Sequence, residues 1–369
     1  MIPFEQALAE TENCKRYLLL GNGFSISLFP DCFSYTSLFE EAKDNELFAN
    51  TIPLERAFEA LETIDFEQVM EALKSSVKLV ALYDANSTAC KLMQDHAELL
   101  KEILVQAIAG RHPARPDKIS EQQYQNCKAF LSQFIGLERG KSNVGKVFTV
   151  NYDLLLYWAS LHDIMDINWK TEKQIHNPKQ ALSNNDGFRL PEDDYNAPYV
   201  AWDQFSASHS QTITYLHGAL HLFERGPELA KLCWERAGNH PLMDQIRSAL
   251  NEDRYPMFVS EDTSKAKMAK INKSAYLSKA LRSFSGCCDT KGAALFVIGH
   301  SLAANDAHIF KRITRGKIGK LYVSIFGNPE NESNRQIIAK ANALAAGRDE
   351  KSPLNVSIID ASGIHIWNH

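Results

Sequence analysis

Polar clusters that carry a carboxamide, a carboxyl group or an imidazole follow several apolar stretches of this sequence. Asn151 and Asp153 come directly after the apolar run 147–150, and His217 follows the β-branched run 212–216. An imidazole titrates near neutral pH, so His217 could act as a general base or could be a hydrogen-bonded structural residue. The carboxamide of Asn151 could hold a ribose hydroxyl or a water molecule, or it could cap the next helix. Asp153 could stabilise a developing positive charge or fix the first turn of that helix.

A glycine turn precedes both clusters in the chain. The apolar run 17–20 is followed without a break by Gly21-Asn22-Gly23-Phe24-Ser25. Backbone N–H groups in such a turn can hold a phosphate, because no side chain blocks the approach. Ile26 stands where a full dinucleotide fingerprint has its third glycine, so a strand that ends in a flexible turn explains the same residues.

Short apolar stretches with the length of strands recur along the chain. The predicted strands are 17–20, 147–150, 212–216, 256–259, 294–298, 321–326 and 356–360. A strand, then a polar cluster, then a helix is typical of an α/β fold, here Rossmann-like with a mainly parallel, doubly wound sheet. Ligands bind beyond the carboxyl ends of the strands in this architecture, so the polar clusters should line one crevice. These clusters are Gly21–Ser25, Asn151–Asp153, His217-Gly218, Gly299–Ser301, which adds His300 as a further candidate, and Gly327-Asn328.

Helical spacing of apolar residues dominates one long segment. It recurs over three stretches, 66–80, 99–108 and 124–134. We therefore expect a single domain over residues 1–369 with a helical insertion after the first strand, at about 51–138. Residues 171–211 are polar and rich in turns, which is typical of a functional loop or lid. Residues 222–252 are predicted to be helical.

Composition and charge limit the class of protein. With 44% hydrophobic and 23% charged residues the chain is globular, and its net charge of -5 argues against a general nucleic-acid binder. No apolar run reaches the length of a membrane span, and the first residues lack a signal-peptide pattern. Cysteines are dispersed and odd in number, seven in all, which favours reduced thiols in the cytoplasm. Because no Cys-x-x-Cys occurs, a structural zinc site is not expected.

The motifs follow one another in a fixed order: Gly21-Asn22-Gly23-Phe24-Ser25, Phe148-Thr149-Val150-Asn151-Tyr152-Asp153, Leu216-His217-Gly218, and Ile298-Gly299-His300-Ser301 with Asn305-Asp306. In this order they resemble the sirtuin-like domains of bacterial anti-phage defence systems. The resemblance covers about residues 15–330 and is closest to the compact branch with a helical insertion after the first strand. It implies NAD⁺ as substrate and an NAD⁺ glycohydrolase that releases nicotinamide and ADP-ribose, acting as a defence or toxin effector.

The resemblance also implies roles for individual residues. Asn151 and His217 match the catalytic asparagine and histidine of related effectors, with Asp153 beside them. The glycine turn matches the pyrophosphate site, and Ser301 and Asn328 would lie near the ribose of the adenosine half. The implied nucleotide-binding set is Gly21, Asn22, Gly23, Phe24, Ser25, Gly299, Ser301, Asp306 and Asn328.

The chain departs from the protein-deacylating sirtuins in one clear respect. Those proteins carry a four-cysteine zinc module, which is missing here, so we expect neither deacylation nor a bound metal. No sensor domain is evident, so the trigger would be the helical insertion, a homo-oligomer or a regulatory protein partner. Two alternatives use the same site: ADP-ribosyl transfer to a protein or nucleic acid, and a module that senses NAD or ADP-ribose without turnover.

Overall fold

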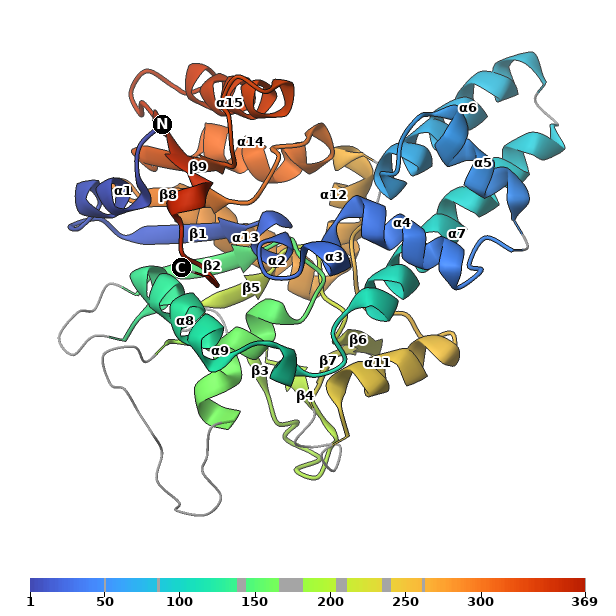
Figure 1. Ribbon diagram of the computed structural model, residues 1–369, viewed down its shortest axis with the longest axis horizontal. Coiled ribbons are helices and arrows are strands. Elements are labelled where there is room, and N and C mark those ends of the chain that lie inside the picture. Colours follow the sequence, from blue (N-terminus) through green and yellow to red (C-terminus); the bar gives the residue numbers. More distant parts are fainter. Residues whose placement is uncertain are drawn as a thin grey trace.

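A six-stranded parallel sheet forms the centre of the computed structural model (Figure 1), with the strand order β10-β9-β8-β1-β2-β5. Its strands are β1 (Arg16–Leu20), β2 (Lys146–Thr149), β5 (Ile213–Tyr215), β8 (Ala294–Ile298), β9 (Lys320–Ile325) and β10 (Asn355–Asp360). The predicted Rossmann-like α/β fold is therefore confirmed. The structure describes residues 1–49, 51–84, 87–137, 144–165, 182–203, 211–233, 240–260 and 263–368.

Helices cover both faces of this sheet, which explains why its strands are apolar without alternation. Leu18 pairs with Phe296 of β8, and the next residue, Leu19, pairs with Phe148 of β2, so the two aromatic rings point to opposite faces. Phe296 packs on α1 (Phe4–Glu10) and α8 (Glu121–Ile135), through Phe4 and Phe134. Phe148 packs on Phe284 of α13 (Ala275–Cys288).

Most of the segment between β1 and β2 is helical. Its helices are α2 (Gly23–Ile26), α3 (Pro30–Phe33), α4 (Tyr35–Asp44), α5 (Ile52–Ala60), α6 (Phe66–Tyr83), α7 (Thr88–Arg111), η1 (Pro116–Lys118) and α8. The three stretches with helical spacing lie in α6, α7 and α8, as predicted. Asp65 caps α6 by accepting from the backbone N–H groups of Glu67 and Gln68. In Figure 1, α5, α6 and the first half of α7 extend away from the sheet.

A second, antiparallel sheet lies where a helix and a loop were predicted, at 222–252 and 171–211. Its order is β3-β4-β7-β6, and its strands are β3 (Phe188–Arg189), β4 (Tyr199–Trp202), β6 (Leu222–Arg225) and β7 (Glu228–Leu232). The prediction of a helix over 222–252 was wrong for its first part, because Gly226 takes a positive φ of 60° and turns the chain into a hairpin. Among the described residues of this stretch, which leave out 234–239, the helical ones are those of α11 (Leu242–Asn251). The predicted strand 256–259 contributes only an isolated bridge between Phe258 and Gly218.

The predicted lid at 171–211 lies partly outside the described residues. Residues 171–181 and 204–210 are not described, whereas 182–203 contain β3 and β4. This middle part is therefore a piece of the antiparallel sheet.

The order of the strands places a switch point beside β1. The chain runs from β1 outward to β2 and β5 on one side and then returns to β8 on the other. The turns after β1 and β8 consequently leave the sheet in different directions and open a crevice at the carboxyl ends of the strands. The remaining described helices, α9 (Leu155–Met165), α12 (Ser264–Lys273), η2 (Ala304–Asp306), α14 (Ala307–Arg315), α15 (Glu332–Ala346) and η3 (Ala361–Gly363), complete the layers. Within the described residues, no helix combines the length and the apolar character needed to cross a membrane.

Candidate functional site

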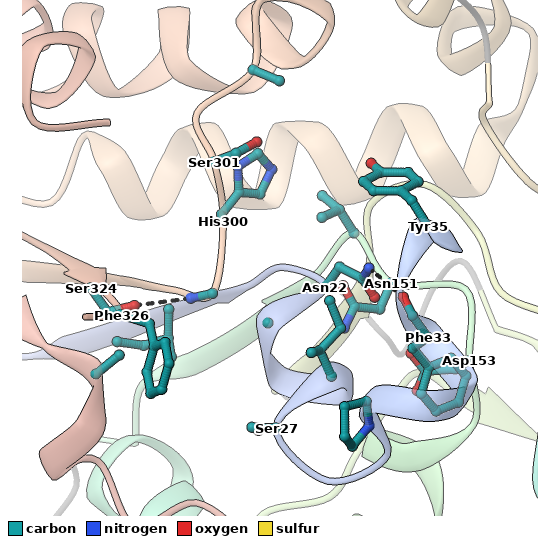
Figure 2. A pocket seen from close by; sticks show the side chains of 18 of the residues that line it. Asn22, Ser27, Phe33, Tyr35, Asn151, Asp153, His300, Ser301, Ser324 and Phe326 are labelled. Carbon is teal, nitrogen blue, oxygen red and sulfur yellow. Dashed lines mark hydrogen bonds between the residues drawn. The ribbon is translucent and has the colours of Figure 1, made fainter. Parts of the chain in front are cut away.

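A cavity of about 1030 Å³ lies at this crevice (Figure 2). Its walls come from the turns after β1, β2, β5, β8 and β9, from α6 and α7, and from the C-terminal segment. Eight of the predicted site residues line it: Asn22, Gly23, Asn151, Asp153, His217, Gly299, Ser301 and Asp306. The structure thus brings together polar clusters that are up to 284 positions apart in the chain (Asn22 and Asp306).

Four predicted residues do not line this cavity. Gly21 and Ser25 are buried within the turn, and the ring of Phe24 packs on Trp367 at 5.0 Å between ring centroids. Asn328 instead organises the start of α15, where its side chain accepts from the N–H of Glu330 and its carbonyl accepts from Asn334.

The two glycine turns pack directly against each other. A Cβ added to Gly23 would lie 2.6 Å from the Cα of Gly299, and the N–H of Gly23 donates to the Gly299 carbonyl at 2.9 Å. The glycine at 23 is therefore required by the neighbouring backbone, whether or not a ligand is present. We expected the turn to offer bare N–H groups, but those of Gly21, Gly23, Phe24 and Ser25 all donate to backbone carbonyls.

Fewer donors than predicted remain open at the crossing of these turns. The backbone N–H of Asn22 makes no hydrogen bond to any described residue, nor do the N–H and hydroxyl groups of Ser301. Both residues line the cavity. Because phosphate oxygens prefer such N–H and hydroxyl donors, this is where an anionic group would be held.

On the β2 side of the cavity, Asn151, Ser25 and Asp153 form a hydrogen-bonded chain. The amide nitrogen of Asn151 donates to the Gly21 carbonyl at 3.0 Å and to the Ser25 hydroxyl at 2.9 Å. Ser25 in turn donates to Asp153 at 2.5 Å. The side-chain oxygen of Asn151 accepts from no described residue and is not sealed from solvent, so it is open to the cavity.

Asp153 has mainly a supporting position. Its second oxygen accepts from the N–H of Leu155 at 2.9 Å, at the first residue of α9. Burial raises the pKa of this carboxyl, against the lowering that its hydrogen bond with Ser25 causes. Asp153 therefore orients Asn151 through Ser25 and fixes the start of α9.

On the β5 side, His217 is almost fully enclosed. The segment after Met257 holds its backbone, because the N–H of Val259 donates to the His217 carbonyl at 2.8 Å. Nε2 of His217 lies 3.1 Å from Nε2 of His308, which belongs to the first turn of α14. Burial holds the pKa of His217 well below its usual range, so the ring is neutral at neutral pH. Nδ1 of His217 contacts no described hydrogen-bonding group and is not sealed, so it faces the cavity.

A cluster of charged groups lies behind the two histidines. Asp306 accepts from Nζ of Lys267 at 2.9 Å with one oxygen and from Nε2 of His300 at 3.2 Å with the other. His300 also accepts from the N–H of Leu302 through Nδ1, which places the proton on Nε2. Although burial opposes it, these neighbours hold the pKa of Asp306 well below its usual range. An ionised carboxylate thus lies 3.8 Å from Nε2 of His217.

Glu67 extends this cluster to α6. Both of its oxygens lie 3.2 Å from Nζ of Lys267, and Asn305 also donates to it. Burial raises the pKa of Glu67 to about 7, since the one ammonium is shared with Asp306. The two carboxyl groups therefore share one positive charge, and Glu67 is the one that takes up a proton.

Three buried groups here are close enough to ligate one metal ion. The ligand atoms of His217, Asp306 and His308 lie within 4.8 Å of one another. However, Lys267 already donates to the Asp306 oxygen of this trio, and its ammonium would repel a dication. The residues therefore fit a hydrogen-bonded arrangement better than a metal centre.

Sequence reasoning missed Glu67, Lys267 and His308. All three come from helices rather than from strand ends, so the rule that located the other clusters does not apply to them. A signal was present for His308, which is two positions after Asp306, but nothing in the sequence indicates that Lys267 of α12 lies between Asp306 and Glu67 of α6.

The C-terminal segment closes the cavity on the side of the glycine turn. The indole N–H of Trp367 donates to the Phe24 carbonyl at 2.9 Å, and the Trp367 carbonyl accepts from Asn126 of α8. Ile364, Ile366 and Trp367 therefore add an apolar wall.

Fold and site together define a Rossmann-like α/β protein with an asparagine and a histidine facing a cavity at the switch point of its sheet. A family model described as a domain of unknown function (DUF4917) matches residues 18–367. Since this match covers nearly the whole chain, the protein belongs to that family. None of the curated proteins matches the sequence significantly.

Proposed function

We propose that this protein is an NAD⁺ glycohydrolase that cleaves NAD⁺ to nicotinamide and ADP-ribose. The observation that carries the proposal is the pairing of two unsatisfied groups on one cavity, the oxygen of Asn151 and Nδ1 of His217. Both are held in place by buried partners, as catalytic groups require. The cavity volume of about 1030 Å³ is also sufficient for a dinucleotide.

The chemistry needs little acid catalysis at the leaving group. Nicotinamide is already cationic in NAD⁺, so its departure generates an oxocarbenium-like ribose. Asn151 would accept from a ribose hydroxyl or from the attacking water and fix its position. His217, neutral because of its burial, would take the proton from that water or hydroxyl. Asp306 would stabilise the imidazolium that results.

The rest of the nucleotide has a place in the same cavity. The open donors at Asn22 and Ser301 would hold the pyrophosphate where the two glycine turns cross. The adenosine half would then lie toward Phe326 and the apolar C-terminal segment, on the β9 side. Asn328 is not on this cavity, so of the two residues expected near the adenosine ribose only Ser301 remains, at the boundary between the pyrophosphate and the adenosine half.

A cytoplasmic NADase must be restrained, and we propose that the α6–α7 region responds to a second copy of the chain or to a regulatory protein in anti-phage defence. Leu79, Leu82 and Tyr83 of α6 are exposed, the last at 91%. The same helix carries Glu67 into the cavity wall. A contact at its far end could therefore affect the charge cluster behind His217.

Product analysis tests the activity. Purified protein is incubated with NAD⁺ carrying a label in the adenosine half, and nicotinamide, free ADP-ribose and labelled macromolecules are followed over time. Equal amounts of nicotinamide and free ADP-ribose are expected. Nicotinamide with label on protein or nucleic acid would show an ADP-ribosyltransferase instead, and NAD⁺ binding without any cleavage would show a sensor.

A further inference from the structure

We propose that His308 is a positioning residue that fixes the tautomer of His217, so that Nδ1 of His217 faces the cavity without a proton and is the nitrogen that acts as base. This inference rests on the proposed function and identifies Nδ1 of His217 as the basic atom and His308 as its positioning partner. His308 is not among the residues that line the cavity, so it would act only through His217.

The geometry makes His308 the hydrogen-bond partner of His217. The two Nε2 atoms lie 3.1 Å apart, and the ring centroids are 5.2 Å apart, so the nitrogens point toward each other. Asp306 cannot take this role, because 3.8 Å is too long for a hydrogen bond to Nε2 of His217. When two neutral imidazoles face each other through Nε2, only one of these two nitrogens carries a proton. The ring that donates this proton has none on Nδ1, which therefore carries a free lone pair.

The surroundings of the two rings decide which of them donates. Burial lowers the pKa of His308 to about 4, so this ring is neutral, and its buried Nδ1 makes no hydrogen bond with the described residues. The nearest negative charge is on Asp306: one of its oxygens lies 3.8 Å from Nε2 of His217, whereas no ion pair joins it to His308 among the described residues, so the shared proton is favoured on Nε2 of His217. Nε2 of His308 is then an acceptor, and His217 donates its Nε2–H to it. Nδ1 of His217 is left as a bare lone pair on the cavity side.

The arrangement therefore follows the logic of a base that is oriented by a third group. Asp306 favours the proton on Nε2 of His217, and His308 accepts it. When Nδ1 of His217 accepts a proton from water or a ribose hydroxyl, the imidazolium keeps its Nε2–H bond to His308. The neighbouring Asp306 carboxylate balances the new charge.

Spectroscopy on the resting protein tests the tautomer without any need for turnover. Nitrogen-15 spectra of labelled histidines distinguish protonated from bare ring nitrogens. We expect Nε2–H with bare Nδ1 for His217, and Nδ1–H for His308. A proton on Nδ1 of His217, or zinc bound stoichiometrically to these nitrogens, would overturn the inference. Because this readout does not require NAD⁺, it separates failure of the inference from failure of the proposed activity.

Kinetics with NAD⁺ tests the consequence. His308→Leu removes the acceptor and should lower kcat by about 10²-fold, the lower end of what a positioned base supplies, with little change in KM. His308→Gln, whose amide oxygen can accept from His217, should recover most of that loss. In a His217→Ala background, His308→Leu should have no further effect. The matched control is His221→Leu, a fully buried histidine that does not line the cavity; it should lower stability but not kcat per folded molecule.

Two outcomes would contradict the positioning role. One is an unchanged kcat in folded His308→Leu. The other is an equal loss of kcat in His308→Leu whether or not His217 is present, since that would mean that His308 acts independently.

Discussion

The two sides of the cavity are built in different ways. On the β2 side, Asn151 is held by a network whose links are all within hydrogen-bonding distance and run through Ser25 to Asp153. On the β5 side, His217 lies against a second neutral histidine, and the charges of Asp306, Lys267 and Glu67 stand behind the pair. The β2 side positions the carboxamide of Asn151, whereas the β5 side sets how readily His217 takes up a proton.

This difference indicates how the site can respond to its surroundings. The hydrogen-bonded chain on the β2 side joins neighbouring residues of two turns, and the central sheet holds both turns in place. The charge cluster depends on α6 and α12, which do not belong to the sheet, and its balance changes when either helix moves. We therefore expect substitutions to affect folding and regulation more strongly on the second side.

The largest effect on stability should come from Lys267, whose side chain is 2% exposed. Lys267→Met leaves Asp306 and Glu67 facing each other without a counter-charge. Removing one partner of a buried ion pair costs about 3–5 kcal/mol of unfolding free energy. Urea unfolding measures it, with Lys43→Met as control, because an exposed ion pair such as that of Lys43 with Glu55 contributes little to stability. An equal loss in both variants would contradict the difference between the cluster and a surface pair.

A smaller effect is expected where the two glycine turns meet. In Gly23→Ala the new Cβ would lie 2.6 Å from the Gly299 Cα, so backbone has to move. Such overpacking costs about 1–3 kcal/mol. Gly286→Ala in α13 is the matched control, because nothing lies within 4 Å of its added Cβ and the helix favours alanine. Equal thermal stability of Gly23→Ala and wild type would show that the turns are not packed as described.

The charge cluster should also make the stability depend on pH. Burial raises the pKa of Glu67 from 4.5 to about 7, so the folded protein holds this proton more tightly than the unfolded chain does. The free energy of unfolding should consequently fall as the pH rises from about 4.5 to about 7 and level off above that range. Subtracting the profile of Glu67→Gln isolates this contribution from that of other carboxyl groups. A difference profile that rises over the same interval would contradict the charge arrangement.

The β2 side could be predicted from the sequence and the β5 side only in part. A buried apolar run ending in Gly21 or Asn151 identifies a strand end, and parallel strand ends meet at one edge, so local pattern and topology suffice. The Gly226 hairpin was missed because its apolar residues allow a helix as readily as two strands. The role of Lys267 could not be predicted for another reason. A lysine in a polar helix is expected to face solvent, and only the tertiary fold buries this one against Asp306.

The central claim is that Asn151 and His217 act on one transition state of NAD⁺ cleavage. The most direct measurement is nicotinamide release by wild type, Asn151→Ala, His217→Ala and the double variant, each expressed per folded molecule from thermal unfolding of the same preparation. We predict losses of about 10²–10⁴-fold in each single variant, because each removes a positioned group, and scarcely more in the double variant. Wild-type turnover in folded His217→Ala, or no cleavage of NAD⁺ by the wild-type protein, would contradict the account.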